Sequence, residues 1–271
     1  LGWYGVVCHR RPNSYFLMLG THVESIDFNL PVDAVTEKPL FAFSCNRVIR
    51  ESYDGPLMRA TDGTDIGVDD LATNVGKQID LLYDQKSRYN FSSNDAVCSG
   101  PYPTLQGCAS EYWLEFTGAE SFSISDASHL GRAGVLAVCD PQGQGRRPVF
   151  TANNGTDELS LDVGTAYMRF ALYGQGEKED LFGGLDYPDL PRNGYVANYD
   201  TNILLRSVDG KGGEAVATRP LPVFSSMLIG KDMAGNNFEG KLIEIVICDF
   251  PIPLDAEQEV FNNWETFYSL T

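Results

Sequence analysis

Short apolar runs separated by turn residues are the feature that most constrains the fold of this chain. Runs rich in branched and aromatic residues, such as "YWLEF" and "SFSIS", recur along the sequence, and 27 glycines and 14 prolines punctuate it. Several runs alternate apolar and polar residues, as strands buried on one face do. The run "KLIEIVICDF" is apolar on both faces, which is typical of a strand buried on both sides. Many short strands between turns predict an all-β sandwich or barrel.

Helical patterns are scarce, and the best of them is the C-terminal segment 253–270, "PLDAEQEVFNNWETFYSL". Asp255 is placed to cap such a helix, and Gln258, three residues later, to complete a capping box. We therefore predict a short amphipathic helix that closes the sandwich. Its apolar face would consist of Val260, Phe261, Trp264, Phe267 and Tyr268.

Three other segments carry weaker patterns. Residues 40–53, "LFAFSCNRVIRESY", contain a helical stripe and predict a second helix. The polar stretch 174–194 predicts a large exposed loop. The glycines of "QGQGRR", around Gly143, precede "PVF" rather than a capped helix, so they predict a hairpin tip and not a phosphate loop.

The charge of the chain restricts its ligands. The net charge is -17 and the pI is about 4.4, so the chain repels phosphate backbones and anionic membranes, and we predict that it binds neither nucleic acid nor a membrane. The acidity serves solubility, or it favours a cation or a neutral, hydroxyl-rich ligand such as a sugar. No apolar run approaches the roughly 20 residues of a membrane helix. The opening "LGWYGVVCHRR" has its charges on the wrong side for a signal leader, and export stays undecided.

Residues with metal or nucleophile chemistry are sparse. The chain has three histidines without paired spacing, His9, His22 and His129, which argues against zinc. The acids of segment 62–70, "DGTDIGVDD", lack the closing glutamate of an EF-hand, so we interpret them as an acidic turn, with calcium as the alternative. Cys98 and Cys108 flank a short loop and are either free thiols or a disulfide. No Gly-x-Ser-x-Gly nucleophile motif is present.

Three segments together resemble the catalytic domain of α-L-arabinofuranosidase B, glycoside hydrolase family 54. They are "LFAFSCNRVIRESYDGPLMRATDGTDIGVD", "IDLLYDQKSRYN" and "SSMLIGKDMAGNNFEGKLIEIVI", which lie at the two ends of the domain. The matching residues are Ser44, Arg47, Tyr53, Gly55, Pro56, Leu57, Arg59, Asp62 and Gly63, then Tyr83, Asp84, Gln85 and Ser87, then Gly230, Asp232, Gly235, Asn236, Phe238, Glu239 and Gly240. The resemblance implies a concanavalin A-like, or laminin-G-like, jelly-roll β-sandwich.

The resemblance also implies where catalysis would lie. The aspartate that acts as general acid in the family corresponds to Asp232, in a shorter loop. The family's nucleophile is a glutamate on a central strand, and the nearest segment here, "GVLAVCDPQG", has none. A retaining hydrolase needs both carboxylates, so we predict that the chain is not an enzyme. Sandwiches of this kind recur in bacteriophage virion proteins, and the acidic chain without catalytic signature is similar to that group.

We therefore predict an N-terminal strand and tether over residues 1–38 and a concanavalin A-like sandwich over residues 39–271. The predicted function is that of a virion structural protein, a phage decoration, head-fibre or tail-fibre module. Its partners would be capsid or fibre subunits and copies of itself, and its further ligand a cell-surface glycan. A glycoside hydrolase of arabinofuranosidase type and a secreted carbohydrate-binding module are the alternatives.

The expected sugar contacts come from the same matching segments and from the rim of the sandwich. No cofactor and no metal are predicted apart from the calcium alternative. The candidates for sugar binding are Asp84, Gln85, Asp232, Asn236 and Asn237, and Asp232 is the catalytic candidate if the chain is a hydrolase. Trp113, Tyr195, Asn198 and Tyr199 are further aromatic and amide side chains expected at the rim.

Overall fold

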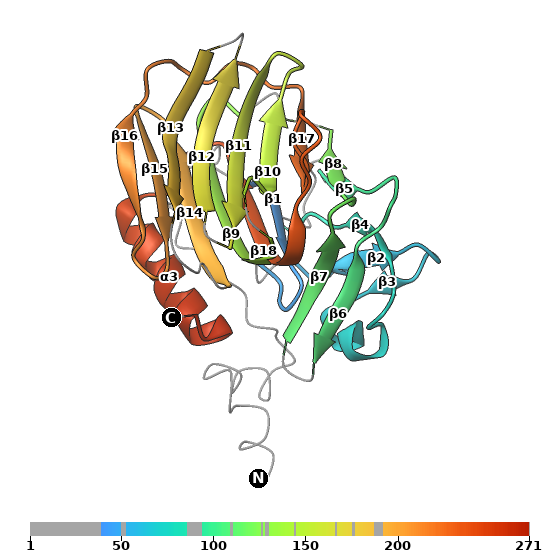
Figure 1. The fold of residues 1–271 in the computed structure, drawn as a ribbon. Helices are drawn as coiled ribbons and strands as arrows, with labels where there is room; N and C mark the ends of the chain where they lie inside the picture. Colours follow the sequence, from blue (N-terminus) through green and yellow to red (C-terminus); the bar gives the residue numbers. More distant parts are fainter. Residues whose placement is uncertain are drawn as a thin grey trace.

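The described part of the chain folds into two antiparallel sheets packed face to face, with a C-terminal helix against the outside (Figure 1). The computed structural model describes residues 39–49, 53–85, 94–108, 111–125, 127, 130–143, 145–165, 167–174, 177–186 and 192–270. The predicted tether over residues 1–38 lies outside these ranges. The prediction of an all-β sandwich with a short C-terminal helix is confirmed.

The two sheets are built from strands that are distant in sequence. Sheet A has the order β16 (Gly212–Val216), β15 (Asn202–Ser207), β14 (Asn193–Tyr199), β9 (Ala133–Pro141), β18 (Glu239–Cys248), β7 (Glu111–Thr117) and β6 (Thr104–Cys108), and β1 (Pro39–Ser44) also pairs with β18. Sheet B has the order β13 (Glu177–Asp186), β12 (Tyr167–Gly174), β11 (Asp157–Gly164), β10 (Pro148–Asn153), β17 (Ser226–Ile229), β8 (Phe122–Ile124), β5 (Ala96–Val97), β4 (Ile79–Leu82), β2 (Met58–Ala60) and β3 (Asp65–Ile66).

Strand β18 is the centre of sheet A. Residues from Gly240 to Cys248 pair with β9, the first four residues of the strand pair with β7, and its second half pairs with β1. Ile245 and Ile247 point into the sandwich, while Val246 and Cys248 point to the opposite face, and all four are fully buried. The strand is therefore covered on both sides, as its apolar sequence predicts.

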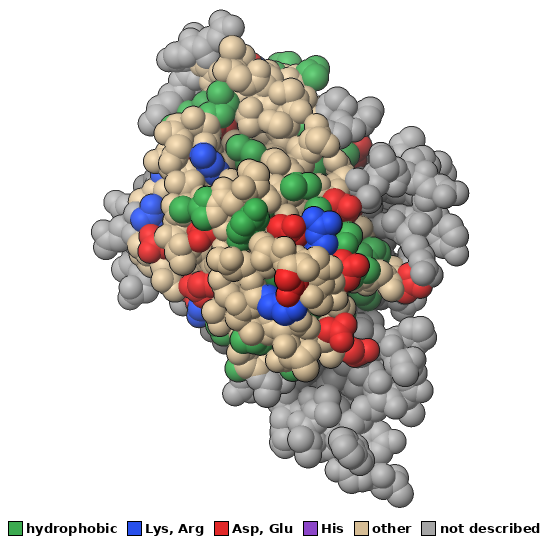
Figure 2. All heavy atoms as spheres, turned by 90° about the vertical axis from the view of Figure 1, so that its right-hand side faces the viewer, with side chains coloured by type: hydrophobic (Ala, Val, Ile, Leu, Met, Phe, Trp, Pro, Cys, Tyr) green, Lys and Arg blue, Asp and Glu red, His purple; other side chains and the backbone are tan. Residues whose placement is uncertain are grey.

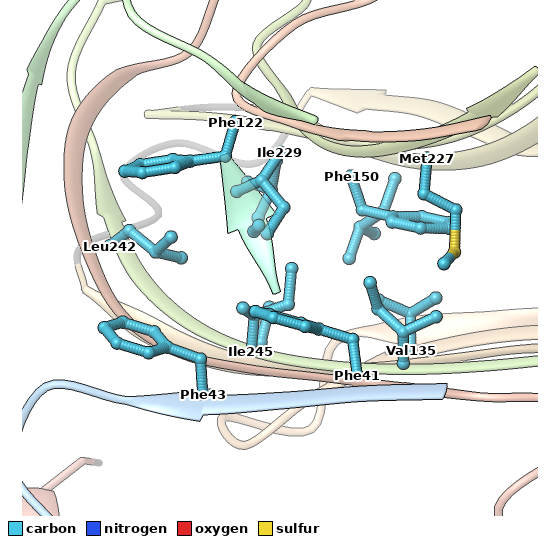
Figure 3. Packing of buried hydrophobic residues seen from close by; sticks show 14 of the residues in the cluster. Phe41, Phe43, Phe122, Val135, Phe150, Met227, Ile229, Leu242 and Ile245 are labelled. Atoms are coloured by element: carbon cyan, nitrogen blue, oxygen red, sulfur yellow. The ribbon is translucent and has the colours of Figure 1, made fainter. Parts of the chain in front are cut away.

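The core between the sheets consists of apolar side chains from both (Figure 3). Each fully buried large apolar side chain contributes about 1.5–3 kcal/mol relative to an exposed one. Figure 3 shows Phe41, Phe43, Val135, Leu242 and Ile245 of sheet A facing Phe122, Phe150, Met227 and Ile229 of sheet B.

Helix α3 (Leu254–Tyr268) covers the outer face of sheet A. Trp264 is fully buried there among apolar side chains of β9, β14 and β18, so the predicted apolar face is confirmed. The predicted capping box is wrong, because the N-cap position is Pro253 and no side chain caps the helix. Asn198 of β14 instead holds the segment that leads into the helix. Its Oδ1 accepts from Ile252 N at 2.7 Å, and its Nδ2 donates to Ile252 O at 2.9 Å.

A buried ion pair lies beneath the end of α3. Arg47 Nε is 3.0 Å from Glu244 Oε2 of β18, and both side chains are fully buried. Helix α3 adds Trp264 Nε1, which donates to Glu244 Oε1 at 2.8 Å, and Tyr268 OH, which donates to Glu244 Oε2 at 2.6 Å. The Arg47 guanidinium also lies 4.0 Å from the ring centroid of Phe267. The pair and its donors therefore connect β18, the segment after β1 and the helix.

Three local predictions are wrong. The described residues of segment 40–53 do not form a helix, because Phe41 and Phe43 alternate with Ala42 between the two apolar layers and complete strand β1. The stretch 174–194 is not one loop, since Glu177–Asp186 forms edge strand β13, which needs a ladder on only one side. The segment around Gly143 is not a hairpin tip, because it crosses from β9 in sheet A to β10 in sheet B.

The surface of the described part has mixed charge in the view of Figure 2, with Asp and Glu side chains beside a few Lys and Arg. Within the described residues no helix is both long and apolar enough to span a bilayer. Cys98 and Cys108 are free thiols in this structure, the first buried and the second exposed.

Candidate functional site

Polar side chains gather on the outer face of sheet B, where β10, β11 and β12 lie side by side (Figure 1). The sequence of β11 alternates, so that Leu159 and Leu161 enter the core. The opposite face of the strand carries Glu158, Ser160 and Asp162. These polar residues are buried, although they do not belong to the apolar core.

Arg146 is the centre of this group, which we call the Arg146 cluster: Arg146, Glu158, Asp162, Arg169, Tyr173 and Asp232. The arginine comes from the crossover between β9 and β10. Its Nη2 donates to Glu158 Oε1, and its Nε lies 3.1 Å from Asp162 Oδ2 and 3.0 Å from Asp232 Oδ2. One guanidinium thus bridges three carboxylates.

The hairpin that follows β17 brings Asp232 to the cluster. An isolated bridge pairs Lys231 with Asn237 and closes this hairpin. Asn236 holds Asp232 from within it: its N donates to Oδ1 at 2.8 Å and its Nδ2 to Oδ2 at 2.6 Å. The backbone N of Met233 donates to Glu158 Oε2 at 2.7 Å, so the hairpin is attached to β11.

Strand β12 supplies the rest of the cluster. Arg169 Nη2 donates to Asp162 Oδ2 at 3.0 Å, and Ser160 Oγ donates to Asp162 Oδ1 at 2.6 Å. The Tyr173 ring lies under both guanidiniums, at 4.6 Å from that of Arg146 and 4.9 Å from that of Arg169. Cation–π contacts of this kind add to the ion pairs.

Burial changes the acidity of the cluster. Burial raises the pKa of Glu158, and the nearby Asp232 adds to the rise, although Met233 N and Arg146 oppose it. Burial likewise raises the pKa of Asp162 against the opposing effect of the two arginines. For Arg146 burial alone would lower the pKa, but Asp162, Asp232 and Glu158 outweigh it and the pKa is raised.

Two hydroxyl groups, one in the cluster and one beside it, have no hydrogen-bond partner among the described residues. They are Thr151 Oγ1 on β10 and Tyr173 OH on β12. Thr151 is fully buried and stands opposite Ser160 in the ladder between β10 and β11. The site therefore combines carboxylates that have protein partners with two neutral hydroxyls that have no hydrogen-bond partner among the described residues.

The structure brings some of the predicted site residues together and separates the others. Asp232 and Asn236 belong to the hairpin, and Asn237 closes it, with Nδ2 donating to Gly235 O at 3.2 Å. Asn237 Oδ1 is buried and has no partner within the described part of the chain. Asp232 itself is 1% exposed.

Asp84 and Gln85 lie elsewhere, after β4, and hold the start of the chain's described part. Asp84 Oδ1 accepts from Ala42 N at 3.1 Å. Gln85 Oε1 accepts from Ile49 N at 3.1 Å, and its Nε2 donates to Ser44 O at 3.1 Å. Both side chains are buried and fasten β1 and the residues that follow it. Their role in sugar binding stays a prediction.

In segment 62–70, Asp62, Asp65 and Asp70 each bind different partners and do not share a common site. Asp62 accepts from Thr64 N at 3.0 Å and from Lys77 Nζ at 2.9 Å, and Asp65 accepts from Tyr83 OH at 2.6 Å. Asp70 Oδ2 accepts from Gly67 N at 3.3 Å at the start of the 3-10 helix η3 (Val68–Thr73). No group of three or more His, Cys, Asp or Glu side chains suited to a metal ion occurs among the described residues.

The expected rim residues are mostly interior. Tyr195 and Tyr199 are 0% and 1% exposed, and the Asn198 side chain makes two hydrogen bonds to the backbone of Ile252. Trp113 is half-buried and donates to Glu115 at 2.7 Å. The expectation that all four are exposed is therefore wrong, because β14 lies inside sheet A and is covered on both sides.

Sequence reasoning missed Arg146, Glu158 and Asp162. The alternation Glu158-x-Ser160-x-Asp162 was a usable signal, because period-two spacing places the three side chains on one face of a strand. Arg146 carried no signal of its own, since it comes from a turn whose position over β11 follows only from the crossover between sheets.

Comparisons with known proteins support the fold. No family model matches the chain, and no curated protein matches it. An arabinofuranosidase solved with arabinofuranosyl-α-1,2-xylobiose superposes with a TM-score of 0.62 at 14% identity, over 84% of this chain and 62% of that one. A family 54 α-L-arabinofuranosidase soaked with a cyclic sulfate inhibitor gives 0.60, with the same identity and coverage.

A smaller structure also matches. Domain 4 of an extracellular family 43 arabinanase of Geobacillus stearothermophilus, in complex with arabinotriose, has a TM-score of 0.52 at 11% identity, over 70% of this chain and 94% of that domain. This chain spans 62% of the length of the two arabinofuranosidases. At these identities the likeness shows a shared fold: the chain is a β-sandwich of the form found in arabinofuranosidases and in a domain solved with arabinotriose.

Proposed function

We propose that this chain is a non-enzymatic, glycan-binding β-sandwich. The observation that carries the proposal is the occupancy of its carboxylates. Every oxygen of Glu158, Asp162 and Asp232 has a protein partner: Arg146 and Met233 N for the first, Ser160, Arg146 and Arg169 for the second, Asn236 and Arg146 for the third. A retaining glycosidase needs one carboxylate free to attack and another free to protonate.

The position of Arg146 supports the absence of hydrolysis. Asp162 and Asp232 touch the same guanidinium nitrogen, so the space between their carboxylates holds a protein side chain. A glycosidase holds the scissile sugar bond in that space. The cluster is therefore better suited to fixing the hairpin over sheet B than to chemistry.

Glycan binding is supported by the fold and by the charge. The domain of the Geobacillus arabinanase was solved with arabinotriose, and a chain of net charge -17 favours neutral over anionic sugars. We assign sugar contact first to the hairpin amides of Asn236 and Asn237, which are half-buried. Asp232 would orient Asn236 from below.

The setting of this function is part of the proposal. We propose that the chain is a phage virion module, a decoration protein, head fibre or tail fibre, that assembles with capsid or fibre subunits and with copies of itself. The support is the acidic sequence and its lack of a catalytic signature. Mass spectrometry of purified virions should find the chain in the particle; its presence only in the culture medium would refute the virion role and favour the secreted alternative.

A glycan array probed with the purified chain tests binding. We expect retention on neutral glycans, weakened in the double variant Asn236→Ala and Asn237→Ala. The matched control is Asn202→Ala, an exposed amide on β15. An array without any signal would contradict the proposed function.

One observation favours the hydrolase alternative: Asp232 corresponds, by resemblance, to the general acid of glycoside hydrolase family 54. Release of arabinose from an aryl arabinofuranoside measures it. We expect no turnover by the chain. Turnover that the substitution Asp232→Asn abolishes would show that Arg146 leaves the cluster during reaction, and it would overturn the non-enzymatic assignment.

A further inference from the structure

A cavity of about 330 Å³ lies at one end of the sandwich, where β14 turns into β15 and where β16 leads towards β17. Its volume falls in the range of roughly 300–1,000 Å³ typical of small-molecule sites. We propose that this cavity binds one neutral sugar unit through its hydroxyls. The inference rests on the proposed function and names a subsite that is separate from the Arg146 cluster and from the hairpin amides.

The wall of the cavity is amphipathic. Ala217, Pro220 and Leu221 supply its accessible apolar groups, and the buried Tyr199 also belongs to the lining. The Tyr199 hydroxyl donates to the carbonyl of Arg219 at 2.6 Å, so the ring is held in place and its polar end is satisfied within the protein. A pyranose or furanose ring presents a face of C–H groups that packs against such a surface.

The lining of the cavity also contains polar groups. It carries the carboxylate of Asp200 and the hydroxyls of Thr201 and Thr218. Among the described residues no side chain or backbone group donates to the Asp200 carboxylate. Its oxygens can therefore accept the charge-assisted hydrogen bonds that two neighbouring sugar hydroxyls donate.

Charge selects a neutral ligand over an anion. Arg219, the cation in the wall, lies 3.4 Å from Asp157 and is turned to that partner. Asp200 and the net charge of -17 repel a carboxylated or sulfated sugar. A neutral polyol has no such cost and uses the same acceptors.

The cavity is held open by the backbone around it. Ala217 N donates to Thr201 O at 3.0 Å, and Asn154 Nδ2 donates to Val223 O at 3.0 Å, so both ends of the lining segment 217–221 are fastened. Val216 and Val223, which flank that segment, are 73% and 74% exposed. They offer an apolar lip to a group attached to the sugar.

Ligand-observed NMR of the full chain with a monosaccharide panel tests the inference. The panel contains neutral aldoses (glucose, galactose, arabinose), a hexosamine and a uronic acid. Two variants address the cavity: Asp200→Asn removes the charge at constant shape, and Ala217→Trp fills the space. Asp69→Asn, an exposed carboxylate in η3, is the control, and thermal unfolding of every variant verifies the fold.

We expect a neutral aldose to bind, with affinity reduced tenfold or more by each cavity variant and unchanged by the control. A preference for the hexosamine or the uronic acid would overturn the neutral assignment. Binding that the cavity variants leave intact, and that Asn236→Ala with Asn237→Ala removes, would overturn this subsite while the proposed function stands. An absence of binding on both the panel and the glycan array would overturn both.

Discussion

Replacement of Arg47 by methionine should reveal how much of the fold depends on one buried ion pair. The side chains of Arg47 and Glu244 are fully buried, and methionine keeps only the apolar stem of the arginine. Removing one partner of a buried pair leaves an uncompensated charge and costs about 3–5 kcal/mol. The substitution also removes the bond from Arg47 Nη1 to Asn263 of α3, at 2.9 Å. We therefore expect the upper part of that range.

Urea unfolding followed by tryptophan fluorescence measures this loss, because Trp264 donates to Glu244 and reports on the network. The double variant Arg47→Met with Glu244→Gln removes the stranded charge and keeps an oxygen for Trp264 and Tyr268. It should be more stable than Arg47→Met alone by about 2 kcal/mol. Lys241→Met is the matched control: its partially exposed pair with Asp140 should contribute at most about 1 kcal/mol.

Two results would refute this reasoning. One is an Arg47→Met chain that loses less than about 1 kcal/mol, which would mean that water or another group compensates Glu244. The other is a double variant no more stable than the single one. In that case the loss would come from packing on Phe267, and the charge of Glu244 would not be its cause.

Three further predictions concern backbone, packing and pH. Gly240→Ala should destabilise more than Gly155→Ala, as urea unfolding would measure: both have positive φ, but a Cβ on Gly240 would lie 2.3 Å from Asp140 O, whereas one on Gly155 meets nothing within 4 Å. Trp264→Ala should cost about 3–5 kcal/mol, and thermal unfolding without a loss of that order would contradict the packing of α3. Burial raises the folded-state pKa of Glu158, so its stabilising contribution is full below the unfolded pKa of about 4.3 and is lost as pH rises through the folded value. Relative to Glu158→Gln, the wild type should therefore lose stability in melting curves as the pH rises above about 4.3, and parallel curves would count against it.

The fold could be predicted from the sequence where periodicity is strong. The two-sided apolar run of β18 and the stripe of α3 are both found as predicted, because burial on both faces or on one face leaves a distinct pattern. Residues 40–53 show the limit of this method. The pattern of Phe41 and Phe43 there fits both an alternating strand and a helical stripe. The segment forms a strand because β1 pairs with β18, which is distant in sequence.

The candidate site was less predictable, because it is assembled by topology. Asp232 was found through resemblance, but its neighbours Arg146 and Asp162 are distant in sequence and meet it only where a crossover and a hairpin reach the same strand. Tyr199 illustrates the opposite error. We expect its ring to be exposed at the rim of the sandwich, whereas the interior position of β14 buries it.

The central place of β18 has a consequence for the synthesis of the chain. Strands β1, β7 and β9 all pair with β18, which is the last strand of the described part and ends at Cys248. Sheet A therefore cannot close until the segment up to Cys248 has been synthesised, and β1 waits for a partner about 200 residues away. This large separation in sequence predicts slow closure of sheet A. Truncation before Glu239 would leave three strands with open edges, and aggregation would follow.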